Sequence, residues 1–287
     1  MDILSDKEQL IAAMGDRWDD INNRLYEMES IPNARDLGGI VTADGKRIKR
    51  GRLFRSALLT YGSDSDIALL RDDLQIGCVI DLRTTYETSR VADREIEGAT
   101  YINMPVMDWD NNLWFEMFKF PGSEAEQLRA FAKTDMAKRM TRHMYIGFVM
   151  DEYCQLQYAA FLQKLLEIDG GTNVLWHCSQ GKDRTGLVAA FLLFALGCDR
   201  QAVVDDFAIT NHYYRNVVDV AVSQLYAVGG TVDDASVVEA LQGVRVDYFE
   251  AALDKLDEEY GSIDTFLRDI LLITPANRQR LRELYLE

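Results

Sequence analysis

Residues 173–186 read NVLWHCSQGKDRTG and combine an apolar run, a cysteine and two glycines in one short stretch. The run 173–177 follows Gly170-Gly171 and predicts a buried parallel strand, because strands covered on both faces are apolar at nearly every position. The apolar segment 187–196 is about half as long as the roughly 20 residues that cross a bilayer, and it suits a buried helix. The stretch therefore predicts a strand that passes through a short glycine loop into a helix.

Further strands are predicted upstream of this stretch. Residues 78–80 and 100–102 have the short apolar pattern of strands, and another strand is expected around Leu53 and Phe54. A helical pattern over residues 153–168 leads back to the strand that begins at residue 173. The alternation predicts an α/β fold with a central, mostly parallel sheet flanked by helices.

Three regions add to this sheet, and we expect all of them to belong to one domain over residues 1–287. Apolar residues at steps of three or four predict an N-terminal helix within residues 1–30, and residues 199–287 give helical patterns only. Residues 105–150 form an insertion rich in aromatic residues and methionine that is too long for a connecting loop. We expect it to be helical, either as a lid over the site or as an extra helical pair packed on the core.

The composition limits the partners and the compartment. A net charge of −16 opposes a general affinity for nucleic acid or anionic lipid. No segment has the apolar length of a membrane span, so stable membrane insertion is not expected. The four cysteines show no CxxC pairing, and residues 1–18 lack the basic and apolar parts of a signal peptide. These features favour the cytoplasm, leave signal-independent secretion open and do not determine the oligomeric state.

The predicted loop has the features of an anion site with a nucleophile. Backbone N–H groups converge where a loop enters a helix N-terminus, and the helix dipole adds partial positive charge there. The same field stabilises a thiolate at Cys178, which makes it the candidate nucleophile. Arg184, six residues later, can offer a planar fork to two phosphate oxygens. Of the four cysteines only Cys178 has an arginine at this spacing.

Residues 177–186, HCSQGKDRTG, resemble the P-loop of the protein tyrosine phosphatase superfamily. The GKDRTG portion is similar to that of bacterial phosphatases with mixed tyrosine and phosphoinositide specificity. Residues 33–39, 53–56 and 80–83 with Glu87 occur in the order that this family shows, and the likeness covers most of residues 31–275. It implies the cysteine-phosphatase fold and the hydrolysis of phosphotyrosine through a phosphocysteine intermediate. Phosphoserine, phosphothreonine or phosphoinositide monoesters are further substrates that it implies, and no cofactor is implied.

The resemblance also implies which residues act. Phosphate contacts are expected from the loop residues Ser179, Gln180, Gly181, Lys182, Asp183 and Arg184. The family with Lys-Asp-Arg in the loop is thought to use the loop aspartate as general acid, which here is Asp183. The alternative acid is Asp108, which follows a predicted strand where other superfamily members carry a separate-loop aspartate. Lys182 is either a second positive charge beside the phosphate or a solvent-facing lysine.

Four residues are expected to support the loop. His177 is expected to orient the loop by a hydrogen bond and not to act as a base. Thr185 either donates a hydrogen bond to the sulfur of Cys178 or satisfies backbone at the helix N-terminus. Arg35 and Asp36 resemble a family motif near the floor of the active site. We also expect Arg55, Asp81 and Arg83 to form one buried ionic cluster under the sheet edge.

Two other functions and a metal site compete with this interpretation. A catalytically inactive module that only binds phosphate often lacks the cysteine or the arginine, and both are present here. A sulfur-transfer loop of the rhodanese type is disfavoured by the Arg-Thr-Gly ending and by the upstream motifs. A zinc site through His177 and Cys178 is not expected, because His143 and His212 are isolated in the sequence.

Overall fold

The computed structural model describes residues 15–107 and 120–287, which form a six-stranded sheet surrounded by helices. The strand order is β1-β2-β3-β6-β4-β5, and the pairs β3·β6, β6·β4 and β4·β5 are parallel, while β1·β2 and β2·β3 are antiparallel. The predicted α/β fold with a mostly parallel sheet is confirmed. The strands are β1 (Leu25–Tyr26), β2 (Ala34–Asp36), β3 (Leu53–Ser56), β4 (Ile76–Asp81), β5 (Thr100–Asn103) and β6 (Asn173–His177).

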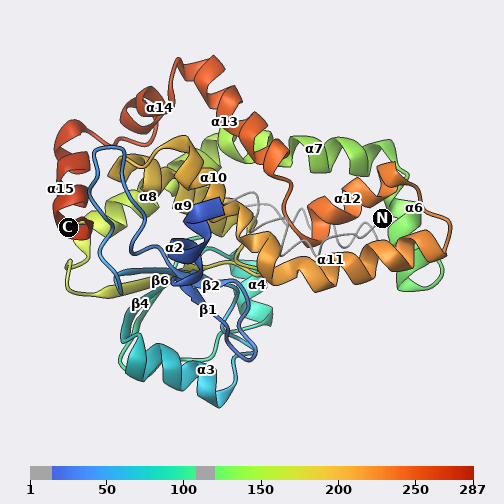
Figure 1. Ribbon diagram of the computed structural model, residues 1–287, viewed down its shortest axis with the longest axis horizontal. Coiled ribbons are helices and arrows are strands. Elements are labelled where there is room, and N and C mark those ends of the chain that lie inside the picture. Colours follow the sequence, from blue (N-terminus) through green and yellow to red (C-terminus); the bar gives the residue numbers. More distant parts are fainter. Residues whose placement is uncertain (1–14, 108–119) are drawn as a thin grey trace.

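Helices cover both faces of the sheet (Figure 1). One face carries α3 (Asp64–Ala68) with its continuation η2 (Leu69–Asp73), and the other carries α8 (Glu152–Glu167), α9 (Asp183–Leu196) and α10 (Arg200–Ala208). The remaining helices are η1 (Gly15–Arg17), α2 (Trp18–Asn22), α4 (Thr85–Arg90), α6 (Glu124–Ala132), α7 (Asp135–Met150), α11 (Thr210–Ala227), α12 (Val232–Gln242), α13 (Val246–Tyr260), α14 (Ile263–Asp269) and α15 (Pro275–Tyr285). No helix of the described ranges is both long and apolar enough to cross a membrane.

The middle of strand β6, residues 174–176, is apolar on both faces of the sheet because helices cover both faces. Val174 and Trp176 belong to the main core under α8 and α9, whereas Leu175 belongs to a smaller core beneath α3. This alternation follows from side chains that point to opposite faces along a strand. Helix α9 is buried almost all round and ends at Gly197, whose φ of 94° closes the helix in a left-handed conformation.

The predicted N-terminal helix is wrong in its C-terminal part. Of the described residues before 30, only η1 and α2 are helical, and the chain then forms β1, in which Leu25 and Tyr26 pair with Arg35 and Ala34. The ring of Tyr26 packs on Phe54 with centroids 6.1 Å apart. Apolar spacing alone does not reveal this pairing with a later segment. The N-terminal residues of the expected helix lie outside the described residues.

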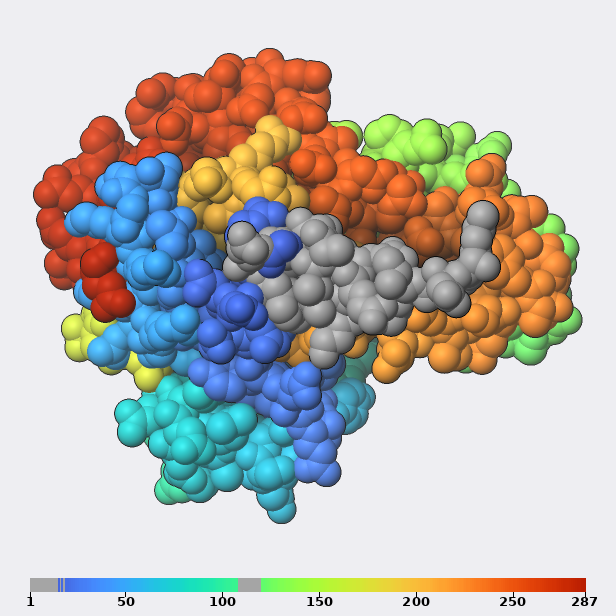
Figure 2. All heavy atoms as spheres, viewed as in Figure 1, coloured from blue at the N-terminus to red at the C-terminus, as the bar shows by residue number. Residues whose placement is uncertain are grey.

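The 105–150 insertion is helical, as predicted, with α6 and α7 in its described part. These helices pack with α11 and α12 around a core of their own that includes Leu128, Phe131 and Val238. Figure 2 shows this lobe as an extension on one side of the molecule, in green and orange. Helix α7 also packs along α13, and the predicted helical character of residues 199–287 is confirmed. The described part of the insertion is thus a packed helical pair, and a lid over the site stays a prediction.

Candidate active site

The loop between β6 and α9 lies at the carboxyl end of the central strand. Its conformation depends on Gly181, which has a φ of 64° and lies against the backbone of Ser56. A Cβ atom at Gly181 would lie 2.2 Å from the carbonyl oxygen of Ser56, so only glycine fits. Cys178 follows β6 directly and is 3% exposed, which places it at the floor of the loop.

The carbonyl oxygens of four successive loop residues are bonded to the surrounding protein. Leu58 N donates to Ser179 O, Tyr214 OH to Gln180 O, and both Asn33 Nδ2 and Arg55 Nη2 donate to Gly181 O at 2.8 Å. The carbonyl of Lys182 accepts from Gly186 N. Because C=O and N–H point in opposite directions across a trans peptide, the amides that follow these carbonyls turn toward the loop interior. This arrangement forms a cradle of donors for an anion.

A buried carboxylate holds the arginines that support this loop. Asp206 on α10 lies 2.6 Å from Arg55 Nη1, 3.0 Å from Arg35 Nε and 3.7 Å from Arg24 Nη1. Burial alone would raise the pKa of Asp206, but the three guanidinium groups hold it well below its usual value. Arg55 therefore belongs to a cluster around Asp206.

Arg35 supports the loop through Asn33. Its Nη1 donates to Asn33 Oδ1 at 2.5 Å, and Nδ2 of the same Asn33 side chain donates to Gly181 O. The expected supporting role of Arg35 thus has a structural basis. Asp36 has a different structural role. Its carboxylate accepts hydrogen bonds from the backbone amides of Gly38 and Gly51 and so holds these two segments together.

Arg184 is fixed by Glu87 of α4. Its two terminal nitrogens donate to the two carboxylate oxygens at 2.7 and 2.9 Å, and Nη2 also donates to Ser179 Oγ at 3.2 Å. Burial alone would raise the pKa of Glu87, but its bonds to Arg184, Ser179 and the amide of Thr84 lower it to about 2. The guanidinium side chain is 12% exposed, so the pair is largely shielded from water.

Asp183 begins α9 and is contacted from the helical lobe. Tyr145 OH on α7 donates to Asp183 Oδ1 at 2.6 Å, and Lys182 Nζ lies 3.9 Å from Asp183 Oδ2. The ammonium of Lys182 donates to the carbonyls of Leu241 and Gly243 at the C-terminal end of α12 and is buried, so the solvent-facing alternative is wrong. Burial lowers the pKa of Lys182, while the nearby Asp183 and Cys178 oppose that change.

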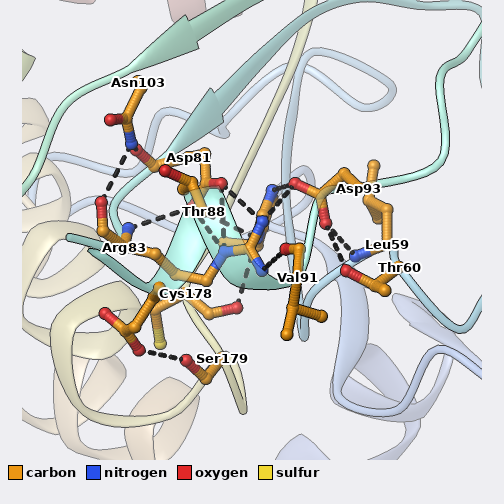
Figure 3. A network of polar contacts seen from close by, with 12 residues as sticks. Leu59, Thr60, Asp81, Arg83, Thr88, Val91, Asp93, Asn103, Cys178 and Ser179 are labelled. Carbon is orange, nitrogen blue, oxygen red and sulfur yellow. Dashed lines mark hydrogen bonds and ion pairs between the residues drawn. The ribbon is translucent and has the colours of Figure 1, made fainter. Parts of the chain in front are cut away.

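A second ionic cluster lies next to the start of the loop at Cys178 (Figure 3). Arg83 lies between two carboxylates, with Nη2 2.7 Å from Asp81 Oδ2 and 2.8 Å from Asp93 Oδ2. His177 Nε2 is 3.1 Å from Asp93 Oδ2, and Nδ1 is 3.2 Å from Cys178 O. Burial would raise the pKa of Asp93, but His177 and Arg83 bring it to about 2. The single cluster predicted for Arg55, Asp81 and Arg83 is therefore wrong, because Arg55 belongs with Asp206.

The carboxylates and the imidazole of this second cluster lie close enough to share a metal ion. Among the described residues, Asp81, Asp93 and His177 are the group with that spacing. Arg83 already supplies a positive charge to both carboxylates, which explains their proximity without a metal. The cluster holds His177 next to Cys178, and the orienting role of His177 stays a prediction.

Two remaining site predictions have different outcomes. Thr185 is fully buried, and its hydroxyl has no hydrogen-bond partner among the described residues. It therefore satisfies no backbone group, and a bond to Cys178 stays a prediction. The alternative acid Asp108 lies outside the described residues.

The sequence assigned no role to five supporting residues, although Asn33 and Glu87 lie in the segments that resemble the family. They are Asn33 and Tyr214 as loop partners, Tyr145 as the partner of Asp183, Asp206 as the partner of the arginines, and Glu87 as the partner of Arg184. Glu87 had one usable signal, because Thr84 and Glu87 form a capping box at the start of α4. The others are single polar residues in helices or loops, and only the tertiary fold brings them to the P-loop.

Residues 26–287 match the profile of the tyrosine phosphatase family. The chain belongs to the tyrosine phosphatase family. The triple specificity protein phosphatase PtpB of Mycobacterium tuberculosis is 30% identical over 282 residues, which cover 90% of this chain and 98% of that protein. A Cupriavidus necator protein named as a tyrosine-protein phosphatase is 29% identical over 248 residues, covering 86% of this chain and 84% of its own length.

The solved structure of Pseudomonas aeruginosa TpbA with phosphotyrosine aligns over 72% of this chain and 89% of that chain. Its identity is 18% and its TM-score 0.32. Family membership makes the chain a phosphoric monoester hydrolase of the protein tyrosine phosphatase type.

Proposed function

We propose that this tyrosine phosphatase works through a phosphocysteine formed at Cys178. The observation that carries the proposal is the loop itself, in which outward-bonded carbonyls turn the amides inward above Cys178. Arg184 stands at the end of the same loop, oriented by Glu87. A nucleophile, a cradle of donors and a fixed guanidinium are the parts that phosphoryl transfer requires.

In the first step the sulfur of Cys178 attacks phosphorus and the bond from phosphorus to the leaving oxygen breaks. The loop amides and Arg184 hold the remaining phosphate oxygens, whose charge they stabilise in the transition state. The leaving oxygen takes a proton from the carboxylic acid of Asp183. In the second step water attacks phosphorus, gives its proton to Asp183, and the S–P bond breaks to release phosphate and the thiolate.

The position and contacts of Asp183 support its role as the acid. It is the first residue of α9 and its side chain is 22% exposed, so it borders the loop and remains open to a substrate. Its Oδ1 is occupied by Tyr145, which leaves Oδ2 for the leaving group. Asp108 remains the rival, and the two are separated by the second experiment below.

Phosphotyrosine is the substrate class that the family supports most directly. The name of the M. tuberculosis relative describes three specificities. On that ground we include phosphoserine or phosphothreonine and phosphoinositides among the proposed substrates of this enzyme. The ammonium of Lys182, however, is committed to two backbone carbonyls. We therefore place phosphotyrosine before phosphoinositide. We also place the enzyme in the cytoplasm, because a nucleophilic thiol has to stay reduced to act.

The first experiment measures release of phosphate from a phosphotyrosine peptide, a phosphoserine peptide and a phosphoinositide, with EDTA and a reductant. Wild type is compared with Cys178→Ser and with the control Cys198→Ser, which removes another buried thiol. We expect turnover of the phosphotyrosine peptide by wild type and Cys198→Ser and none by Cys178→Ser. Phosphate binding by wild type without turnover would support an inactive binding module instead.

The second experiment compares Asp183→Asn with Asp108→Asn on phenyl phosphate. Removing a general acid slows cleavage of such a poor leaving group by about 100-fold or more. We expect that loss for Asp183→Asn and near-normal turnover for Asp108→Asn. The opposite pattern would transfer the acid role to Asp108.

A further inference from the structure

The hydroxyl of Tyr145 contacts the proposed acid from outside the P-loop. Tyr145 lies on α7 of the 105–150 insertion, 38 residues before Asp183, and its O–H donates to Asp183 Oδ1 at 2.6 Å. An O–H···O hydrogen bond of 2.6 Å is at the short end of the usual range. The contact therefore fixes one oxygen of the carboxyl group.

The ring of Tyr145 is held firmly enough to aim this hydroxyl. The residue is 1% exposed, and its ring meets Phe207 and Phe249 edge-on at 5.4 and 6.3 Å between centroids. Phe148 contacts it at 6.4 Å from the same helix. Three aromatic neighbours from α7, α10 and α13 thus restrict the ring, and few other directions remain for the hydroxyl.

The hydroxyl stays a donor throughout the range in which the enzyme can work. Burial raises the pKa of Tyr145 well above its ordinary value, and the neighbouring Asp183 raises it further. The phenol is consequently neutral and keeps its proton on the side of Asp183. Only Asp183 Oδ2 then remains to carry the proton that the leaving group receives.

We infer that Tyr145 is a positioning residue for the general acid, which holds Asp183 with Oδ2 directed to the leaving oxygen. This inference rests on the proposed function and extends it to a residue of the helical insertion. Productive orientation of a reacting group accounts for a large part of enzymatic rate, so a carboxyl group free to rotate should transfer its proton less effectively. The effect should appear only where the leaving group needs the proton.

Two other buried tyrosines provide matched controls. Tyr285 OH donates to Leu165 O at 2.9 Å, remote from the loop, so Tyr285→Phe removes a comparable hydrogen bond without touching the acid. Tyr214 OH donates to Gln180 O at 2.7 Å, so Tyr214→Phe loosens the loop without touching Asp183. The three variants separate general stability, loop geometry and positioning of the acid.

The test compares kcat/KM for phenyl phosphate, a poor leaving group, with that for a fluorinated umbelliferyl phosphate, a good one. We expect Tyr145→Phe to lose about tenfold or more on phenyl phosphate and less than about twofold on the good substrate. Tyr285→Phe should leave both unchanged, and Tyr214→Phe should affect both alike. Equal losses on the two substrates for Tyr145→Phe, or no loss on either, would overturn the inference.

A double-mutant cycle makes the test specific to the acid. In an Asp183→Asn background, Tyr145→Phe should cause no further loss on phenyl phosphate, whereas independent roles would make the losses multiply. Thermal melting and alkylation of Cys178 show whether Tyr145→Phe keeps its fold and its loop. If it unfolds, Tyr145→Met, a smaller and flexible apolar side chain without a hydroxyl, takes its place. Absence of turnover in wild type is the separate result that defeats the proposed function itself.

Discussion

The guanidinium of Arg184 and the carboxylate of Glu87 form a two-point pair, with N–O distances of 2.7 and 2.9 Å. Glu87 also accepts from Ser179 Oγ and caps α4 through the amide of Thr84. One carboxylate thus links the phosphate-binding arginine, the start of the loop and a separate helix. Such a planar pair fixes the orientation of an arginine more strictly than a single contact.

Replacement of Glu87 should impair catalysis through Arg184. Glu87→Gln removes the charge that orients the guanidinium, and we expect kcat/KM for a phosphotyrosine peptide to fall by about 10- to 100-fold. The matched control is Glu126→Gln, since Glu126 occupies the same capping-box position of α6 and is exposed. Steady-state kinetics of the two variants check this prediction, and an equal effect of both would contradict it.

The pair of Glu87 and Arg184 should make the free energy of unfolding depend on pH. Because the pKa of Glu87 is about 2 in the folded protein against an ordinary 4.5, its contribution is complete above pH 4.5 and is lost as the pH falls toward 2. That contribution is on the order of 2 kcal/mol. In urea unfolding, the stability gap between wild type and Glu87→Gln should therefore shrink between pH 5 and 3. A gap that stays constant over this range would count against the pair.

Asp206 should be essential for stability because it neutralises buried arginines. Asp206→Asn leaves Arg35 and Arg55 without their carboxylate, and breaking such a buried pair costs about 3–5 kcal/mol. Its neighbour Asp205 pairs with Arg17, which is 45% exposed, so Asp205→Asn should cost about 1 kcal/mol or less. Denaturant unfolding of both variants measures the difference. Similar costs would show that the arginine cluster does not depend on Asp206.

Gly181 should tolerate no side chain. In Gly181→Ala the new Cβ meets the backbone of Ser56 at 2.2 Å, so the loop has to move and turnover should fall by about 100-fold or more. Gly45 also has a positive φ, 85°, but nothing lies within 4 Å of its Cβ position. Gly45→Ala should therefore lose only about 1 kcal/mol of stability and keep its activity. If both variants stayed active, the proposed close approach of the loop would be refuted.

The central strand and its loop could be predicted because their signal is local. Residues 173–177 are apolar on both faces, and glycine then marks the turn, so strand β6 has the predicted limits. The predicted N-terminal helix failed after Asn22 because β1 exists only through its pairing with Ala34 and Arg35. The local periodicity of residues 25–26 does not show that they pair with a later segment.

The supporting residues could not be predicted for a similar reason. Asp206 and Tyr145 lie in helices whose periodicity shows only that they are helical, and nothing local pairs them with Arg55 or Asp183. Lys182 shows the limit of the motif. Its spacing predicts an ammonium beside the phosphate, yet that ammonium bonds to carbonyls at the C-terminal end of α12. Motif spacing identifies the loop, whereas the fold determines where each side chain of the loop points.

The most direct test of the account is detection of the covalent intermediate. Wild type is mixed with a phosphotyrosine peptide, quenched in acid during turnover and digested, and the peptide that contains Cys178 is analysed by mass spectrometry. We predict a phosphate group on Cys178 in wild type, and neither phosphate nor turnover in Cys178→Ser. Continued turnover by Cys178→Ser, or wild-type turnover with the phosphate on another residue, would contradict the account.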